Sequence, residues 1–365
     1  KICHLRMVLS SSVSETQLTQ SRVRLRTIIL STALGLILVA AVIVSAITGQ
    51  LAISPSDVVG SLLKWMGIAN SWAPADPVIE STLQVVRFPR IVMALAVGAA
   101  LAVAGALMQA VFGNPLAEPG VVGVSSGAAL GASTAIVFGI SASGGGVALL
   151  AFLGGLGATL LVYAVARAGG RTEVVTLLLT GIAINAFAQA GLAFVLFLAD
   201  TASREQIVFW QLGSLAGSLW SEVVVVLPVL VIGTVLALMM SRQLDLLALG
   251  ERNARHLGVD VERLRIVAIV LVALLTGVAV AFAGIIAFVG LVVPHIIRMA
   301  LGPAHRGLLL ASAVGGGALL AVADLLTRTL VSGADLPIGM LTALVGGPFF
   351  FGLLYQQRRR SGGWA

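Results

Sequence analysis

Charged side chains are scarce in this sequence. They make up 10% of the 365 residues, whereas ordinary soluble domains carry about 25%. Hydrophobic residues account for 59% of the chain, and the mean hydropathy is +1.08. A water-soluble globular protein is therefore excluded.

Residues suited to catalysis or metal binding are also few. The single cysteine, Cys3, excludes an intramolecular disulfide and a cysteine metal cluster. Neither of the two lysines, Lys1 and Lys64, follows a glycine, so no phosphate-binding G-x-x-x-x-G-K-[ST] loop exists. The four histidines lack metal-ligand spacing, and the G-x-S-x-G match at 123–127 lies in a glycine-rich apolar segment. We expect no catalytic residue, no metal site and no cofactor bound by this chain.

Long apolar runs dominate what remains. Each is long enough to cross about 30 Å of hydrocarbon. The weakly polar stretch between Arg265 and Arg298 is too long for one crossing, and Gly284 and Pro294 offer places to break it. The sequence predicts an all-α polytopic membrane protein with about ten transmembrane helices. The expected spans are 27–49, 91–112, 119–139, 147–166, 175–199, 222–240, 266–282, 284–300, 308–330 and 338–355.

The basic residues predict the orientation of these spans. With an internal N-terminus, 17 of the 22 Lys and Arg residues fall in inner loops and tails, as the positive-inside rule requires. We therefore expect cytoplasmic tails at 1–26 and 356–365, and one transmembrane domain over 27–355. Because the basic residues lie in loops without interleaved aromatics, they indicate membrane anchoring and not nucleic-acid binding.

A short internal repeat points to a transporter. Residues 98–105 and 277–284 match at five of eight positions, and a proline follows each copy, at Pro115 and Pro294. The match is either a chance similarity in a chain rich in glycine and alanine or a true repeat. Since five crossings separate the copies, a true repeat would be inverted in the membrane, as in many transporters with broken helices. We expect irregular backbone at 114–119 and 284–294. The stripe of Gly123, Gly127 and Gly131 predicts close helix packing.

Few polar groups lie within the spans. Asp324 has Arg328 one helical turn later, and the two form either a self-satisfied ion pair or part of a proton relay. Gln109, Asn185 and Gln189 are either interhelical hydrogen-bonding groups or the lining of a pathway.

Two loops look like contact surfaces. The inner segment 241–264 carries a pattern that predicts a short amphipathic helix ending at Gly258, which either docks into a cytosolic partner or forms a solvated loop. Arg87 and Arg90 lie on the outer side in the predicted topology, where the positive-inside rule predicts few basic residues. They either face an acidic partner or extend toward lipid headgroups.

These motifs, in this order, resemble the FecCD family, the permeases of type II ABC importers for iron-siderophores, heme and cobalamin. The resemblance covers about residues 30 to 355. Its motifs are Arg87-Phe88-Pro89-Arg90, Gln109, Asn114-Pro115-Leu116-Ala117-Glu118-Pro119-Gly120, Trp210 with Gly213-Ser214, Leu249-Gly250 with Ala254 and Leu257-Gly258, Phe288 to His295 with Arg298, Asp324, and Leu336-Pro337-Ile338-Gly339 with Gly347-Pro348-Phe349.

The resemblance implies a homodimer in the bacterial cytoplasmic membrane, with two ATPase subunits that hold ATP and Mg²⁺ and an external substrate-binding protein. It ranks heme first as cargo, ferric siderophore second and cobalamin third. A self-contained secondary carrier is the rival interpretation. Gly113 departs from the larger residue often found there in the family, which affects the shape of the implied gate.

The resemblance also implies roles for individual residues. They are Arg87, Arg90 and Arg328 in docking of the binding protein; Asn114, Leu116, Val174 and Val175 at the cytoplasmic gate; Gln109, Asn185 and Gln189 along the pathway; and Leu249, Gly250, Arg252, Ala254, Arg255, Leu257 and Gly258 in coupling to the ATPase.

Overall fold

The structure of the chain is a computed structural model that describes residues 28–49, 51–140, 145–168, 171–331 and 333–360. The predictions for the N-terminal tail 1–26 lie outside these residues. The helix that contains the last predicted span continues to Arg360, beyond the predicted boundary at 355.

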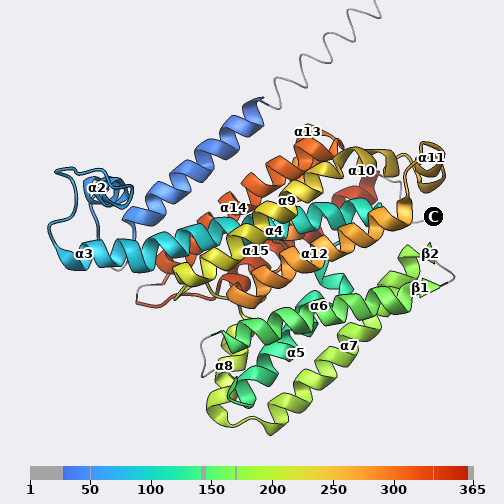
Figure 1. Cartoon of the computed structure of the whole chain (residues 1–365), viewed down its shortest axis with the longest axis horizontal. Helices are drawn as coiled ribbons and strands as arrows, with labels where there is room; N and C mark the ends of the chain where they lie inside the picture. Colours follow the sequence, from blue (N-terminus) through green and yellow to red (C-terminus); the bar gives the residue numbers. More distant parts are fainter. Residues whose placement is uncertain (1–27, 50, 141–144, 169–170, 332, 361–365) are drawn as a thin grey trace, which may run out of the picture.

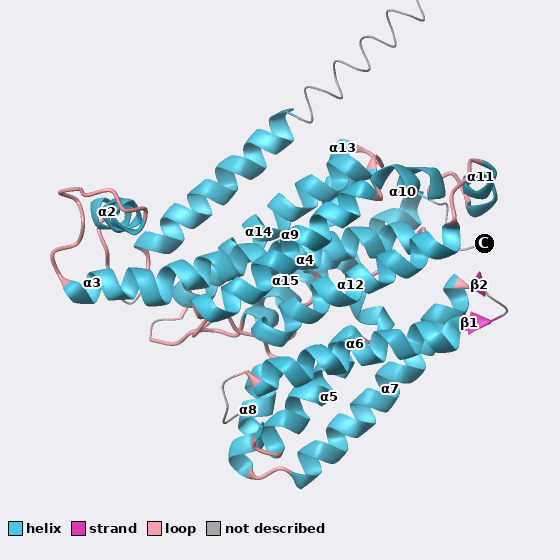
Figure 2. Cartoon of the chain, in the orientation of Figure 1, coloured by secondary structure: helices cyan, strands magenta, loops and turns pink. Residues whose placement is uncertain are grey.

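Helices make up almost all of the described chain (Figure 2). Eight of them are long and apolar enough to cross a membrane, and two shorter apolar helices bring the total to the ten that the sequence predicts. The long ones are Ile28–Ile47, Pro77–Phe112 (α3 Pro77–Ser81, η1 Thr82–Arg87 and α4 Phe88–Phe112), α6 (Gly146–Ala166), α7 (Val174–Leu198), α9 (Trp220–Met239), α12 (Val261–Ala283), α14 (His305–Thr329) and Ile338–Tyr355 within α15 (Ile338–Arg360). The shorter ones are α5 (Val124–Val137) and α13 (Val289–Leu301).

Short elements connect these spans. They are α2 (Pro55–Trp65), the 3₁₀-helix η2 (Pro119–Val122), α8 (Thr201–Gln211), α10 (Ser241–Leu247), α11 (Glu251–His256) and the antiparallel strands β1 (Arg167–Ala168) and β2 (Arg171–Thr172). In Figure 1, α2 and α3 lie at one end of the long axis, and α10, α11 and the two strands lie at the other. These are called the α2 end and the α11 end below.

Helix α4 forms the centre of the bundle, in contact with α9, α12, α13 and α14. Small residues allow this packing, because lipid gives no hydrophobic drive for helix association and close backbone approach must replace it. A Cβ added to Gly98 would lie 2.2 Å from the Gly316 carbonyl oxygen of α14. Helices α5 to α8 form a second group beside this bundle (Figure 1).

Two of the three glycines of the stripe, Gly127 and Gly131, form the close helix packing that the sequence predicts. Gly127 and Gly131 lie against the backbone of Gly154 and Leu150 in α6. Gly123 instead caps the start of α5 with φ +86°, a left-handed conformation that favours glycine.

The helices are interrupted in both regions that the repeat predicts. The two interruptions do not fall at equivalent positions of the repeat, whose copies are 179 residues apart. Helix α4 continues past Gly105 to Phe112, whereas α12 ends directly before Gly284. The second irregular segment is also shorter than predicted, because Pro294 lies inside α13.

The segment 241–264 forms two short helices where the sequence predicted one. The chain breaks at Gly250, with φ +101°, and then begins α11. The predicted glycine end of the helix is confirmed, since Gly258 follows α11 with φ +85°.

Candidate functional site

A buried cluster of charges joins distant segments at the α2 end. Asp324 of α14 is 1% exposed and accepts from Arg90 Nε of α4 at 2.9 Å. The same carboxylate lies 3.2 Å from Arg328 Nε, so the predicted pair with Arg328 is confirmed but is shared with Arg90. Arg90 Nη1 also donates to Asp335 Oδ2 at 2.6 Å. Sequence reasoning missed Arg90 and Asp335 as partners, because they come from other elements of the fold.

Arg87 lies beside this cluster and is held differently. Its guanidinium donates to the main-chain carbonyl oxygens of Ala46, Ile47 and Leu51, and it forms no ion pair among the residues described. The Arg87 residue is 4% exposed. Its charge is therefore balanced by carbonyl dipoles from the end of the first span, not by a carboxylate.

These groups line a cavity of about 410 Å³ at the α2 end. Arg87, Arg90 and Arg328 contribute three positive charges to its wall, and Asp335 contributes one negative charge. Asp324 lies behind them. The three arginines that the family resemblance assigns to docking therefore line one cavity and do not lie on an open surface.

The two chain breaks contact each other. Gly113, with φ +58°, ends α4, and Asn114 Oδ1 accepts from the Leu116 N–H at 3.0 Å to hold the turn that follows. Glu118 Oε1 accepts from the backbone N–H of Phe288, the residue before α13, at 3.2 Å. A Cβ added to Gly105 would lie 1.7 Å from the Gly290 carbonyl oxygen.

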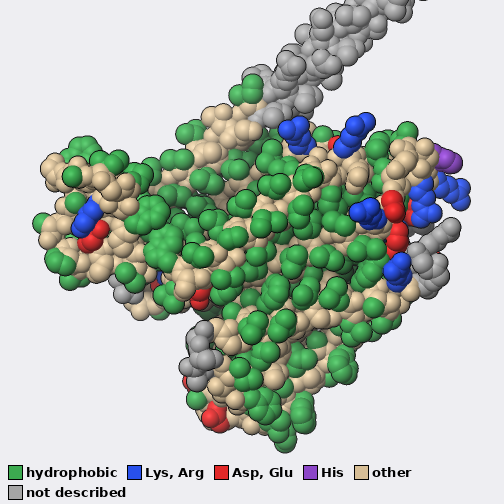
Figure 3. Space-filling model, in the orientation of Figure 1, with side chains coloured by type: hydrophobic (Ala, Val, Ile, Leu, Met, Phe, Trp, Pro, Cys, Tyr) green, Lys and Arg blue, Asp and Glu red, His purple; other side chains and the backbone are tan. Residues whose placement is uncertain are grey.

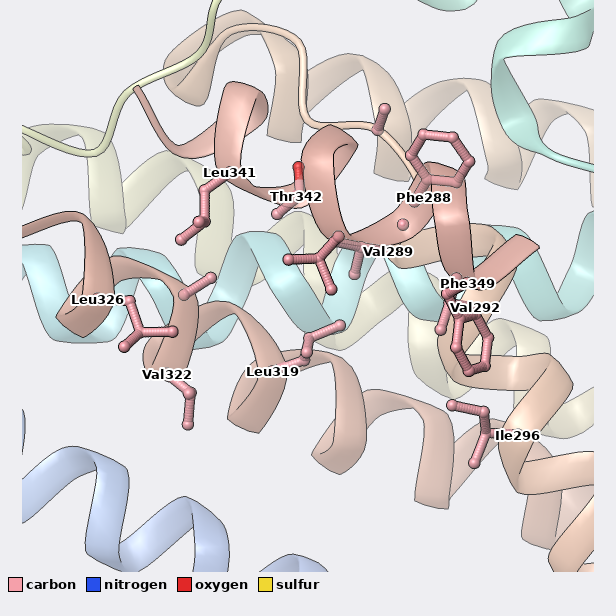
Figure 4. A pocket seen from close by; sticks show the side chains of 14 residues that line it. Phe288, Val289, Val292, Ile296, Leu319, Val322, Leu326, Leu341, Thr342 and Phe349 are labelled. Carbon is pink, nitrogen blue, oxygen red and sulfur yellow. The ribbon is translucent and has the colours of Figure 1, made fainter. Parts of the chain in front are cut away.

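Phe288 has an unusual backbone conformation at this contact. Its φ of +68° is the only left-handed value among the described non-glycine residues. Its ring lines an apolar cavity of about 220 Å³ between α13, α14 and α15, opposite Phe349 and near Thr342 (Figure 4). Residues held in a sparsely populated backbone conformation cluster at functional sites.

The segment around Trp210 holds the second break in place. The Ser214 N–H donates to the Ala283 carbonyl at 2.9 Å, and the Ile338 N–H donates to the Gly213 carbonyl at 3.0 Å. A Cβ added to Gly284 would lie 2.3 Å from the Trp210 carbonyl oxygen. Trp210 and Gly213-Ser214 therefore act through the backbone.

Two of the three polar residues predicted within the spans, Gln109 and Asn185, form hydrogen bonds to neighbouring elements. Gln109 is fully buried, and its Nε2 donates to the Leu291 carbonyl of α13 at 3.1 Å. Asn185 Oδ1 accepts from Ser126 Oγ, and its Nδ2 donates to the Gly120 carbonyl at 3.4 Å. Gln189 lies exposed on α7. Of these three, Gln189 alone is open to a pathway along that helix.

The residues proposed for the gate lie at the α11 ends of α4 and α7. Asn114 is exposed, Leu116 and Val174 are half-buried, and Val175 is 66% exposed. Gly113 and Val174 line the same cavity, so the two predicted gate segments, at the end of α4 and the start of α7, border one cavity.

The turns that follow α10 and α11 present apolar side chains at the α11 end. Leu249 is 60% exposed and Leu257 is 59% exposed, whereas Ala254 is fully buried. Arg252 and Arg255 lie exposed between them, and the face in Figure 3 shows basic side chains gathered at this end. Glu251 ties α11 to α12 through Arg265 at 2.9 Å. The surface is a platform tied to α12 by this ion pair, with two exposed leucines.

Ten apolar helices, two broken segments in contact and an exposed helical platform at one end define the fold of a membrane permease. Residues 37–356 match the FecCD transport family, and the chain belongs to that family. It is an ABC transporter permease subunit.

Similar proteins carry different cargoes. The chain is 43% identical to the hemin transport system permease protein HmuU of Yersinia pestis, over 76% of this chain and 84% of that protein. It is 41% identical to the cobalamin import system permease protein BtuC of Halobacterium salinarum, over 83% of each. The fold matches a metal-chelate type ABC transporter in an inward-facing conformation, with TM-score 0.78 and 34% identity over 90% of this chain and 99% of that one.

Proposed function

We propose that this chain forms the membrane path of an ATP-driven importer whose cargo is heme. The observation that carries the proposal is the family match over residues 37–356, together with the 43% identity to a hemin permease. Ferric siderophore and cobalamin are the alternative cargoes, since the similar proteins include a cobalamin permease and a metal-chelate transporter.

The energy comes from separate ATPase subunits. The sequence has no phosphate-binding loop of the Walker type, so ATP and Mg²⁺ bind on the partner chains. The leucines Leu249 and Leu257, in the turns that follow α10 and α11, form the docking platform, because exposed apolar side chains beside arginines suit a protein interface. Closure of two ATPases beneath a permease homodimer then exchanges its outward-open and inward-open packing.

The arginine cavity at the α2 end receives the external binding protein. Its three guanidinium groups exceed the carboxylates of Asp324 and Asp335 by one charge. Arg87 has only carbonyl partners, so an acidic side chain entering the cavity finds an uncompensated cation. At the opposite end, Asn114, Leu116, Val174 and Val175 close the exit, and Gln189 on α7 faces the path between two copies.

Reconstitution tests the proposal. The permease is placed in proteoliposomes with its ATPase and binding protein, and uptake of heme, a ferric siderophore and cobalamin is measured. We expect ATP-dependent heme uptake and no flux when the ATPase is omitted. Gradient-driven flux by the permease alone would instead identify a secondary carrier, and uptake of cobalamin in preference to heme would refute the cargo assignment.

A further inference from the structure

An apolar cavity of about 670 Å³ lies between the first span (Ile28–Ile47), α2, α4 and α9. It is called the α2 cavity below. Its wall comes from the stretches 42–47, 55–65, 88–95 and 220–227, and it shares no residue with the arginine cavity. All sixteen wall residues are Ala, Val, Ile, Leu, Pro, Phe or Trp. None of the roles described above uses this space.

The α2 cavity is accessible from the bilayer. Its wall includes Ile43 of the first span and Leu227 of α9, and both side chains are exposed on helices long enough to cross a membrane. The first span runs along the edge of the bundle and ends beside α2 (Figure 1). Of the eight candidate spans described, it has the smallest buried share, 11% of its apolar window. Lipid tails therefore reach the space between these two spans.

Helix α2 is fixed in place at this cavity. The Trp65 ring of α2 stacks on the Trp220 ring of α9, with centroids 6.0 Å apart and planes 11° apart. Trp220 Nε1 donates to the Gln84 carbonyl at 2.7 Å, and Gln84 Nε2 donates to Ser61 Oγ of α2 at 2.9 Å. Because α2 is tied to η1 and to α9, the cavity is a feature of the fold and not a gap beside a loose helix.

The charges of α2 lie outside the cavity wall. Asp57 accepts from Ser54 Oγ at 2.7 Å, and Lys64 Nζ lies 3.7 Å from Glu80 Oε1. Neither residue belongs to the wall. An occupant is therefore recognised by its apolar surface and not by a charged group.

The depth of the cavity limits what can fill it. Its wall covers at most eight residues of each span, a rise of about 10 Å, whereas one leaflet is half of the roughly 30 Å hydrocarbon core. A membrane-spanning helix would need contacts over the whole core. Sixteen wall residues are also fewer than the roughly 20–30 residues a side of a stable protein interface. The volume does fall within the range of about 300–1,000 Å³ found for small-ligand pockets.

We propose that the α2 cavity binds one acyl chain of a phospholipid from the leaflet at the α2 end. The chain restores the dispersion contacts that an empty apolar wall would lack. The headgroup stays at the level of Trp65 and Trp220, because tryptophan favours the boundary between headgroups and tails. The site depends on neither the cargo nor the ATPase, so its failure would leave the proposed function untouched.

Photolabelling of the full-length chain, purified in detergent and stripped of lipid, tests this inference. The probe is phosphatidylcholine with a diazirine in one acyl chain, and the labelled peptides are mapped by mass spectrometry. We expect saturable labelling of the wall stretches, displaced equally well by unlabelled phosphatidylcholine and phosphatidylglycerol. Labelling that spreads over all lipid-facing helices and never saturates would overturn the proposal, as would displacement by phosphatidylglycerol alone.

Variants separate the cavity from the general lipid-facing surface. Ile43→Trp combined with Leu62→Trp enlarges two exposed wall residues and should lower saturable labelling by about tenfold or more, since each methylene shut out loses its burial. Val231→Trp with Val235→Trp is the matched control, at exposed positions of α9 outside the wall, and should leave labelling unchanged. Thermal midpoints near that of wild type establish that both double variants fold. Equal labelling of the two would overturn the proposal.

A cysteine variant tests the alternative occupant. Ile43→Cys is made in a Cys3→Ser background and oxidised in native membranes. We expect monomers, because a lipid chain fills the cavity. Disulfide-linked dimers would assign the α2 cavity to a second copy of the chain and overturn the proposal.

Discussion

The Glu118 carboxylate accepts a hydrogen bond from the backbone N–H of Phe288, 170 residues further along the chain. The bond joins the turn after α4 to the residue that begins α13. It therefore links the two broken segments. Burial raises the pKa of the Glu118 carboxyl, and the Phe288 N–H opposes that shift.

Glu118→Gln tests this link through pH. The raised pKa means that the folded chain binds the Glu118 proton more tightly than the unfolded chain does, so stability falls as pH rises from the ordinary pKa of Glu toward the folded value. The Gln side chain still offers an oxygen to Phe288 but does not ionise. We expect the variant to match wild type in acid and to exceed its thermal midpoint at neutral pH. Exposed Glu205→Gln is the control, and parallel pH curves for wild type and Glu118→Gln would contradict the prediction.

Asp324→Ala tests the buried charge cluster. It leaves Arg90 and Arg328 without the carboxylate they share, and removing one partner of a buried ion pair costs about 3–5 kcal/mol. The Asp335 side chain is 34% exposed, so water can replace its hydrogen bond to Arg90. Asp335→Ala should therefore reduce the free energy of unfolding by less. Unfolding of both variants in detergent is compared with wild type. If both variants lost the same free energy of unfolding, the burial of Asp324 would not explain its contribution to stability.

Gly105→Ala tests the contact between the broken segments. The added methyl would meet the Gly290 carbonyl at 1.7 Å, and two backbones must separate to admit it. Overpacking of this kind costs about 1–3 kcal/mol. Gly157→Ala is the matched control, since a Cβ there meets nothing within 4 Å. The thermal midpoints of the two variants should diverge, with the control at or above wild type.

Leu257→Asp and Leu249→Asp test the platform at the α11 end. Both leucines are more than half exposed, so the free energy of unfolding should change by less than about 0.5 kcal/mol. Co-purification of the ATPase and ATP-driven uptake should nevertheless fall by about tenfold, because a charge is buried at the interface. Ile68→Asp, at a site on the α2 end that is 50% exposed, should leave co-purification intact. Retained assembly in both leucine variants would place the ATPase elsewhere.

Cysteine labelling tests the orientation. In a Cys3→Ser background, Arg252→Cys should react with a membrane-impermeant maleimide only after the cells are opened, whereas Lys64→Cys should react in intact cells. The reason is the positive-inside distribution, which assigns the arginine-rich α11 end to the cytoplasm. The reverse pattern would invert the topology and the roles proposed for the two ends.

The sequence alone determined the class of the protein and the number of its apolar helices. Spans such as α6 and α7 begin and end within a residue or two of their predicted bounds, because hydrophobic length and flanking charge are local properties of the chain. The break at Gly284 was predictable for the same reason.

The tertiary structure alone decided which groups meet. Arg90 and Asp324 are 234 residues apart, and only the packing of α4 on α14 brings them together. Burial of Arg87 among carbonyls, the bond from Phe288 to Glu118 and the α2 cavity likewise depend on how helices cross. Apolar periodicity fixes the helices themselves, but in lipid it does not fix their partners, since close contacts between small residues make that choice.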